Sequence, residues 1–286
     1  DFCREYSLGR TPNPCIACNQ YIKFDTLLSK AGQLGADCLA TGHYARVEPS
    51  SDGYRLLKAV DSAKDQSYFL YPLRQAQLRH LLLPLGYLRK TEVRRLAAEM
   101  GLPSAAKRES QDICFIPDNG YRSFISEHIP SQPGDIVDSK GKILGSHRGL
   151  AHYTVGQRQG LGLASNRRLY VLKIDTSSNR LVVGARDQLL ASRLFARRLS
   201  WVSGRAPQEF INIMAKLRYK SPEVAVNLHL EDGAAEVRFI EPQPAVAPGQ
   251  AIVFYRGEAM LGGGVIETSE LAQRGESNKQ SHTILC

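Results

Sequence analysis

The chain has 286 residues, enough for two or three domains, and its 43% hydrophobic and 23% charged composition is that of an ordinary soluble globular protein. No apolar run approaches the ~20 residues of a membrane-spanning helix, and the first ten residues lack the apolar core of a secretory signal. The net charge of +9 favours a polyanionic partner such as nucleic acid, with a basic but uninvolved surface as the alternative. Six scattered cysteines exclude a secreted disulfide scaffold and predict a cytoplasmic protein with reactive thiols.

The first distinctive stretch, residues 11–19, reads Thr-Pro-Asn-Pro-Cys-Ile-Ala-Cys-Asn. Its two prolines predict a rigid extended loop that presents Cys15 and Cys18 ahead of a helix beginning near Gln20. A thiol at a helix N-terminus lies at the positive end of the helix dipole. We therefore expect the dipole to lower the thiol pKa and to make the thiol a better nucleophile.

The next elements predict part of a parallel α/β sheet. Apolar residues at helical spacing predict a helix over 24–34 that ends at Gly35, and a buried strand is expected over 38–46. Ligands of such sheets bind at the carboxyl ends of the strands, where Thr41, Gly42 and His43 fall. For His43, a structural role is an equally good interpretation.

A turn at 50–53 and a strand over 54–60 come next, followed by helices from Gln75 and over 91–100. The second helix has an apolar face that we expect to be buried, and Gly101 follows it. The basic residues around it form either a solvated face or a phosphate track. Further along, Cys114 lies between two large apolar residues, which favours an inert core thiol, although the polar residues before it suggest a loop.

The C-terminal half has a β pattern. Residues 121–128 are expected to be helical, and the stretch 145–162, rich in glycine, histidine and arginine, fits either an RNA-facing surface or a bulged β-ribbon. Short strands at regular spacing predict hairpins and then a small antiparallel barrel. They are expected at residues 169–174, 180–184, 211–219, 224–230, 235–240, 251–255 and 259–266.

These elements predict an α/β part over residues 1–118, a small linking module over 119–190 and an antiparallel β-barrel over 191–268. The polar residues 269–286 are expected to form a disordered tail. No glycine loop of the kind that cradles phosphates precedes residue 20.

The pair Cys15-x-x-Cys18 has three interpretations. A structural zinc site needs about four ligands, and no second C-x-x-C pair is present. A thioredoxin-like redox pair requires a different strand and helix context. The third interpretation is a single sulfur-handling cysteine, Cys18, that works with a distant partner such as Cys114, and spacing alone does not decide among the three.

Six motifs resemble, in the same order, those of the bacterial tRNA-specific 2-thiouridylases. They read TPNPCIACNQYIKF, LATGHYAR, KDQSYFL, ESQDICFIP, YTVGQRQGLGL and PGQ…FYRGE…LGGGVI, and the similarity spans residues 5–267. The resemblance implies an adenine nucleotide alpha hydrolase-like α/β domain followed by a linking module and a β-barrel. It also implies an enzyme that uses ATP with Mg²⁺ to activate the wobble uridine of tRNA and replaces its 2-oxygen with sulfur from a cysteine persulfide.

The resemblance assigns roles residue by residue. Cys18 matches the nucleophile and Cys114 the cysteine that carries the persulfide, and the two form a transient disulfide when the cycle closes. Other matching positions are expected to contact the target base (Asn13, Pro14, Cys15), ATP (Gly42) and tRNA (His43, Lys64, Asp65, Gln66, Arg218, Tyr219, Gln250). The implied partners are the tRNA anticodon loop and a protein that donates persulfide sulfur, with no membrane and no resident metal.

The chain departs from the family pattern at two points. Family members begin with a strand and a Ser-Gly-Gly-x-Asp-Ser loop for the ATP pyrophosphate, and this chain has neither. We therefore expect that an N-terminal segment is missing and that the chain as given does not adenylate tRNA. The alternatives are a non-catalytic tRNA-binding or RNA-binding module and a zinc-stabilised RNA-binding protein.

The second departure from the family pattern is Cys15, which stands where many relatives have an aspartate. If that aspartate serves as an acid or base, the thiol must take over this role or another residue must supply it.

Overall fold

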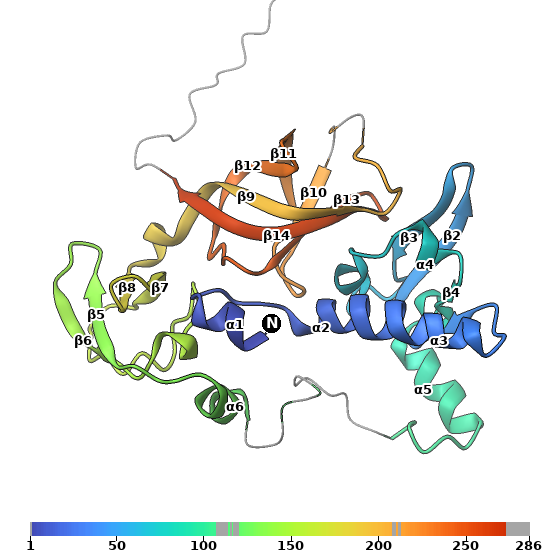
Figure 1. The fold of residues 1–286 in the computed structure, drawn as a ribbon, viewed down its shortest axis with the longest axis horizontal. Helices are drawn as coiled ribbons and strands as arrows, with labels where there is room; N and C mark the ends of the chain where they lie inside the picture. Colours follow the sequence, from blue (N-terminus) through green and yellow to red (C-terminus); the bar gives the residue numbers. More distant parts are fainter. Residues whose placement is uncertain are drawn as a thin grey trace, which may run out of the picture.

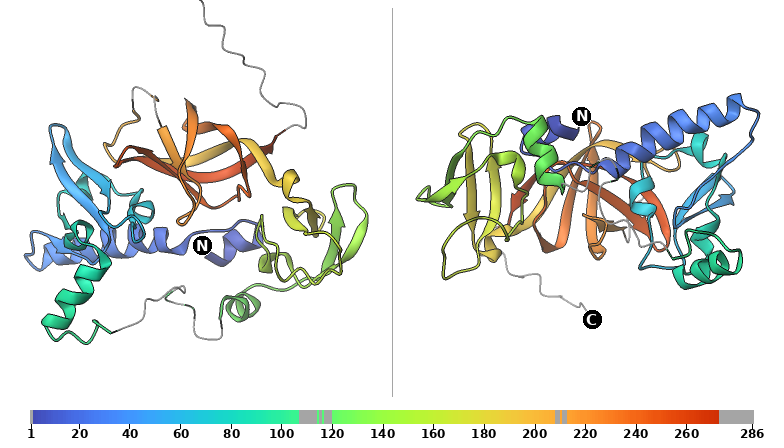
Figure 2. Two further views of the ribbon diagram at one scale, coloured as in Figure 1. Left: turned by 180° about the vertical axis from the view of Figure 1, so that it is seen from behind. Right: turned by 90° about the horizontal axis from the view of Figure 1, so that it is seen from below.

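The computed structural model describes residues 2–106, 114, 116, 120–207, 210 and 213–272, and residues 121 and 122 by their backbone only. A central β-barrel lies between an α/β part on one side and a smaller β module on the other (Figure 1). The N-terminal helices run past the barrel from one flanking part to the other, as the two further views also show (Figure 2). Among the helices described, none is both long and apolar enough to cross a membrane.

The N-terminal segment forms one short helix, α1 (Phe2–Ser7), and then a long continuous helix. The long helix consists of α2 (Pro14–Ala17), a π-helical stretch (Cys18–Leu27) and α3 (Leu28–Gln33), with helical dihedral angles at every junction. It ends at Leu34, and Gly35 follows with φ +83°, as predicted.

The prediction that this helix begins near Gln20 is wrong. Asn13 caps the helix by accepting a hydrogen bond from the backbone N–H of Cys15, and Pro14 occupies the first helical position. Proline is well suited to that position because its fixed φ is helical and its missing N–H has no helical acceptor there. Cys15 and Cys18 therefore lie within the helix and not in a loop ahead of it.

The α/β part contains a two-stranded parallel sheet, β1 (Leu39–Ala40) with β4 (Leu81–Leu82), and an antiparallel hairpin, β2 (Ala45–Ser50) with β3 (Gly53–Lys58). The expected buried strand over 38–46 is therefore divided by a loop, and β1 is not buried. The expected long helix from Gln75 is also wrong. Only α4 (Gln75–Leu78) is helical, because the chain turns into β4 directly afterwards.

The helix α5 (Lys90–Glu99) and the positive φ of Gly101 after it are as predicted. Its apolar face is not buried by the described residues, since Leu96 is 36% and Met100 is 72% exposed. The expectation of a buried inner face is therefore wrong for this part of the chain.

The barrel has the strand order β13-β10-β11-β12-β9-β14 and is closed by pairing of β13 with β14. Its strands are β9 (Leu190–Trp201), β10 (Ile213–Lys216), β11 (Val224–Glu231), β12 (Ala234–Pro244), β13 (Ala251–Arg256) and β14 (Ala259–Leu271). The predicted antiparallel barrel is confirmed, although β9 was not among the predicted strands.

β9 pairs with both β12 and β14 and buries Ala191, Leu194 and Ala196. Its sequence, LASRLFARRLSW, contains arginines and alanines but none of the β-branched residues that are typical of strands. Its arginines are accommodated because neighbouring strands supply acids, as in the pairs Arg193–Glu236 at 3.2 Å and Arg197–Glu267 at 2.8 Å.

The linking module comprises α6 (Gly120–His128) and a four-stranded sheet of order β6-β5-β8-β7. The strands are β5 (Gly134–Asp138), β6 (Ile143–His147), β7 (Tyr170–Asp175) and β8 (Arg180–Gly184). The predicted hairpin β7–β8 is confirmed. Tyr6 of α1 packs against Ile125, Ile129 and Ala151, so the N-terminal segment is anchored to this module.

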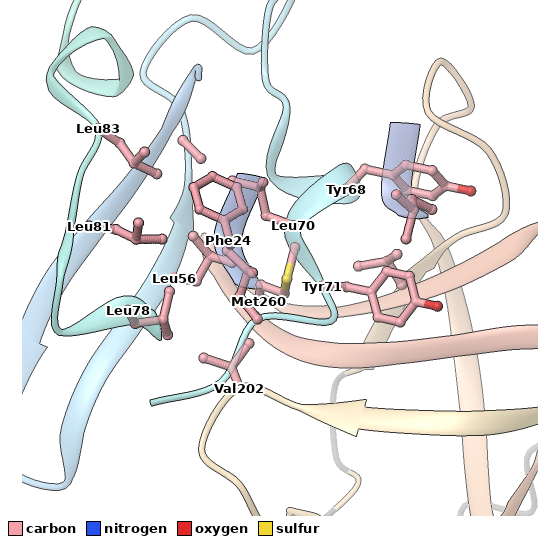
Figure 3. Close-up of a cluster of buried hydrophobic side chains, with 14 of the residues drawn as sticks. Phe24, Leu56, Tyr68, Leu70, Tyr71, Leu78, Leu81, Leu83, Val202 and Met260 are labelled. Carbon is pink, nitrogen blue, oxygen red and sulfur yellow. The ribbon is translucent and has the colours of Figure 1, made fainter. Parts of the chain in front are cut away.

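A hydrophobic cluster joins the long helix, the hairpin and the barrel (Figure 3). Phe24 of the helix is 1% exposed and belongs to the same cluster as Leu56, Leu70 and Met260. β3 also pairs with β14 at Leu57↔Ala259, so the hairpin extends the sheet of the barrel. The helix that carries Cys15 and Cys18 is therefore fixed to both the α/β part and the barrel.

Candidate active site

Three thiols lie around one small cavity of about 160 Å³. The residues that line it are Pro14, Cys15, Cys18, Asn19, Lys23, His43, Gln66, Phe69 and Cys114. The fold thus brings Cys114 to the pair that begins the long helix, although 96 residues separate Cys18 from Cys114. The interpretation of Cys114 as an inert core thiol is wrong, because the residue is exposed at this cavity.

A larger hollow of about 470 Å³ lies beside the same helix and the segments around residues 36, 37 and 80. Its polar lining comes from Asp25, Ser29, Asp37 and His80, and no predicted site residue lines it. The smaller cavity is the better candidate active site because it holds the nucleophilic groups.

The π-helical winding decides which side chains of the helix share the thiol cavity. Leu28 donates its N–H to the carbonyl of Lys23, and the hydroxyl of Thr26 donates to the carbonyl of Tyr21 at 2.8 Å, so both contacts span five residues. A π-helical turn is wider than an α-helical one, so residues four and five positions apart lie toward one side of the helix. Cys18 and Lys23, five positions apart, both line the cavity.

The thiol of Cys15 does not show the expected effect of the helix dipole. Although Cys15 is exposed over the residue as a whole, burial of its thiol at the cavity raises its pKa. The neighbouring Cys114 and Cys18 raise this pKa further, and Lys23 lowers it. The prediction of a lowered pKa is wrong for Cys15, because desolvation and like charges outweigh the dipole there.

His43 is a buried, hydrogen-bonded member of the site. Its Nδ1 lies 2.8 Å from the hydroxyl of Thr41, and its Nε2 lies 3.2 Å from Oδ1 of Asn19 and 3.4 Å from Nζ of Lys23. Burial lowers the pKa of His43 to about 4, and Lys23 contributes to the lowering. The imidazole is therefore neutral near pH 7 and works as a hydrogen-bonding group.

We expect the His43→Gln variant to lose part of the acid sensitivity of the fold. The pKa of His43 is lowered from 6.5 to about 4, so between these values the unfolded chain binds a proton that the folded chain does not. This contribution to the free energy of unfolding is therefore fully present above pH 6.5, and about 3 kcal/mol of it is lost as the pH falls to 4. Urea unfolding at pH 7, 6, 5 and 4 should show a shallower decline for the variant. The same change at exposed His229 should leave the decline unaltered.

The predicted tRNA-contact triplet 64–66 divides between two environments. Gln66 lines the cavity and accepts a hydrogen bond from the backbone N–H of Tyr44 at 3.0 Å. Asp65 is 4% exposed and accepts from the backbone N–H groups of Ala59 and Ser67, each at 3.1 Å. Lys64 is half-buried and does not line the cavity. Asp65 therefore holds the loop between Ala59 and Ser67 by accepting hydrogen bonds from its backbone. The contact of Asp65 with tRNA stays a prediction.

The barrel residues Arg218 and Tyr219 lie near the site but do not line the cavity. Arg218 is exposed, and the ring of Tyr219 packs on Phe69 with 4.4 Å between the ring centroids. Since Phe69 lines the cavity, Tyr219 connects the barrel to one wall of the site.

Gln250 fixes the loop that leads into the long helix. Its side-chain amide donates a hydrogen bond to the carbonyl of Thr11 at 2.7 Å, and the N–H of Thr11 donates to the carbonyl of Pro248 at 2.8 Å. Gly249, at φ +88°, permits this approach, because a Cβ there would lie 2.8 Å from the nitrogen of Thr11. The barrel thus holds the loop two residues before the Asn13 cap.

Replacing Gln250 by alanine is expected to destabilise the fold by about 1–2 kcal/mol, because the half-buried carbonyl of Thr11 loses its donor. The same variant should react more readily with thiol reagents at Cys15, since the helix start is held less firmly. Urea unfolding and peptide-resolved alkylation measure the two effects. Gln33→Ala, at the exposed end of α3, is the control and should change neither.

Gly42 follows β1 and is exposed. A Cβ at this position would meet only a side-chain carbon of Leu85 at 3.5 Å, an ordinary contact. Packing within the described chain therefore does not require glycine here, and this is compatible with close approach of a ligand to the backbone.

The five described cysteines are all free, so the transient disulfide between Cys18 and Cys114 stays a prediction. Cys3 and Cys38 do not line the cavity, and Cys286 lies outside the described residues, as does most of the 109–117 motif. Within the described parts of the chain, no group of three or more histidine, cysteine, aspartate or glutamate side chains is arranged to hold a metal ion. The zinc interpretation of the cysteine pair therefore has no support in this structure.

Sequence reasoning did not find Asn19, Lys23 and Phe69 as site residues. Asn19 and Lys23 follow Cys15 at intervals of four, a spacing that places side chains on one helix face. This signal is lost if the helix is taken to begin near Gln20. Nothing in the sequence around Phe69 distinguishes it from a core aromatic residue.

Three family models match consecutive parts of the chain. They are described as the tRNA methyl transferase HUP domain (residues 1–118), the tRNA methyl transferase PRC-barrel domain (122–185) and the aminomethyltransferase beta-barrel domain (191–266). The tRNA-specific 2-thiouridylase MnmA of Geotalea uraniireducens is 54% identical over 271 residues, which cover 93% of this chain and 72% of the relative. The chain belongs to the tRNA-specific 2-thiouridylase family.

Other members of this family have similar sequence identity to this chain. The tRNA-specific 2-thiouridylase MnmA of Acidithiobacillus ferrooxidans is 49% identical over 273 residues, covering 94% of this chain and 78% of the relative. The tRNA-specific 2-thiouridylase MnmA 1 of Caldanaerobacter subterraneus is 49% identical over 271 residues, covering 93% of this chain and 74% of the relative. The family membership and the fold class expected from the motifs are thus confirmed, with a HUP domain first and a β-barrel last. The exact domain boundaries expected from the sequence stay predictions.

Proposed function

We propose that this chain carries the sulfur-transfer centre of a tRNA-uridine 2-sulfurtransferase that acts on the wobble uridine. The observation that carries the proposal is the single cavity lined by Cys15, Cys18 and Cys114. The two cysteines to which the family motifs assign nucleophile and persulfide roles come from distant parts of the sequence and share this cavity. The relatives are named as tRNA-specific 2-thiouridylases, which agrees with this assignment.

In the proposed reaction, the 2-oxygen of the uridine attacks the α-phosphate of ATP and pyrophosphate departs. The resulting adenylate is needed because that oxygen is otherwise a poor leaving group. The outer sulfur of a persulfide on Cys114 then forms a bond to C2, and the oxygen departs with AMP. The thiolate of Cys18 attacks Sγ of Cys114 and breaks the sulfur–sulfur bond, which leaves sulfur on the base and a Cys18–Cys114 disulfide. In the other order, Cys18 attacks first and releases the outer sulfur as hydrosulfide, which then attacks C2. Either order ends with a disulfide that a thiol reductant must reopen.

The surroundings of the cavity support this chemistry. Asn13 and Pro14 begin the helix beside Cys15, where a target base would enter, and neutral His43 supplies a hydrogen-bonding edge. Exposed Gly42, after a parallel strand, is the proposed contact for ATP. The net charge of +9 suits a tRNA partner, and a base in an anticodon loop is cheaper to unstack than one in a duplex.

The test is a thiolation assay with tRNA, ATP and a persulfide donor, read out as 2-thiouridine by nucleoside mass spectrometry. The chain is assayed alone and as a fusion behind a segment that carries a Ser-Gly-Gly-x-Asp-Ser loop. Formation of 2-thiouridine in an ATP-dependent manner supports the proposal. Binding of tRNA without 2-thiouridine from either form would instead favour the non-catalytic RNA-binding module.

A further inference from the structure

Lys23 lies among the thiols of the cavity without a role in the assignments above. Among the described residues that line this cavity, it is the one lysine or arginine. The other basic group, His43, is neutral near pH 7 because burial lowers its pKa to about 4. In the described part of the chain, Lys23 is thus the cation that faces Cys15, Cys18 and Cys114.

The position of Lys23 is fixed by the fold. Lys23 lies five residues after Cys18 in the same π-helical stretch, and the next residue, Phe24, is 1% exposed in the hydrophobic cluster (Figure 3). Nζ of Lys23 lies 3.4 Å from Nε2 of His43, so its ammonium group points toward the cavity. A flexible surface lysine would have no such anchor, whereas this one is half-buried.

The cavity needs a positive charge for a physical reason. Sulfur transfer uses thiolates and a persulfide anion, and burial disfavours a charged thiolate, as the raised pKa of Cys15 shows. The three thiols also repel one another when charged, as the effects of Cys114 and Cys18 on the pKa of Cys15 indicate. Lys23 acts on the pKa of Cys15 in the opposite direction and lowers it.

We propose that Lys23 is a positioning residue for sulfur transfer, whose ammonium group holds the anionic sulfur atoms of the cavity in place and stabilises their charge. The role in sulfur transfer rests on the proposed function, but the electrostatic effect on the thiols does not. The effect can therefore be measured on the chain without tRNA or ATP.

The test is the rate at which iodoacetamide alkylates each cysteine of the reduced chain, followed by peptide mass spectrometry. For Lys23→Gln, we expect alkylation of the cavity cysteines at pH 7.5 to slow by up to about tenfold, and the pH profile of Cys15 to move to higher pH. Glutamine keeps the helix propensity of the position. Exposed Cys38, outside the cavity, is the internal reference and should react at an unchanged rate.

Two matched variants separate charge from structure. Lys23→Arg keeps the charge and should restore alkylation to within about twofold of the original chain. Lys30→Gln removes a charge from the exposed face of the same helix and should leave all rates unchanged. If Lys23→Gln does not fold, added salt gives a second measurement on the original chain. It should slow the cavity cysteines relative to Cys38, because salt screens the lysine charge.

Unchanged alkylation rates in folded Lys23→Gln would overturn the inference. So would an equal loss in Lys23→Arg, because that would show a requirement for shape and not for charge. Failure of the proposed function gives a different pattern, in which no 2-thiouridine forms although Lys23→Gln still slows alkylation.

Discussion

Replacing either Cys18 or Cys114 by serine is expected to lower the rate of 2-thiouridine formation by about a thousandfold or more. A serine hydroxyl is a far weaker nucleophile than a thiolate near neutral pH, and it cannot carry a persulfide or close a disulfide. Both thiols line the same cavity, so each variant removes one of the two sulfur atoms that form the disulfide when the sulfur is transferred. The measurement is 2-thiouridine per tRNA over time in the ATP-dependent assay.

Two further results follow from the same assignment. The double variant should be no slower than either single variant, because the two cysteines act as a unit. During turnover without added reductant, non-reducing peptide mapping of the original chain should show a Cys18–Cys114 disulfide, and both single variants should lack it.

The other cysteines provide matched controls. Cys38→Ser changes an exposed thiol that does not line the cavity and should leave the rate unchanged. Cys15→Ser should reduce the rate by less than either of the two catalytic substitutions, because Cys15 borders the base site in the proposed mechanism. If Cys18→Ser and Cys114→Ser retained full activity, the assigned mechanism would be wrong.

Phe24→Ala is expected to lower the free energy of unfolding by about 3–5 kcal/mol, the cost of deleting a fully buried aromatic side chain. Phe24 is 1% exposed and packs in the cluster that joins the long helix to the hairpin and the barrel (Figure 3). Its ring centroid is 5.6 Å from that of His43, so the cavity beside it should also lose its fixed geometry. Urea unfolding at pH 7 measures the stability, and peptide-resolved alkylation of Cys18 reports the cavity.

Tyr21→Ala is the matched control for Phe24→Ala. Tyr21 is an aromatic residue of the same π-helical stretch but is 56% exposed. Its replacement should change the free energy of unfolding by less than about 1 kcal/mol. A loss as large in Tyr21→Ala as in Phe24→Ala would contradict the prediction, because burial in the cluster would then not distinguish the two rings.

Much of the fold could be predicted from local patterns. The strands β11 and β13 and the hairpin β7–β8 lie where apolar segments and turn residues predict them. Gly35 and Gly101 end their helices at positive φ, as their positions predict. These features depend on neighbouring residues only, so the sequence contains the necessary information.

The errors occur where distant contacts outweigh local preference. β9 is a strand in spite of its alanines and arginines, because β12 and β14 supply pairing partners and acidic side chains. The segment after Gln75 is helical for only one short turn, because Leu81 and Leu82 pair with β1. At the start of the long helix, Asn13 and Pro14 formed a cap and a first turn where their composition suggested an extended loop.

The sequence by itself determined the reactive groups and their family context: the Cys15-x-x-Cys18 pair, Cys114 and the six motifs in order. Only the tertiary structure decided that these three thiols share a cavity with Lys23 and His43. The π-helical winding depends on five-residue hydrogen bonds that a 3.6-residue period does not reveal. The hydrogen bond from Gln250 to Thr11 joins residues 239 positions apart. Contacts at such separations form only when the whole chain packs, so no local pattern in the sequence encodes them.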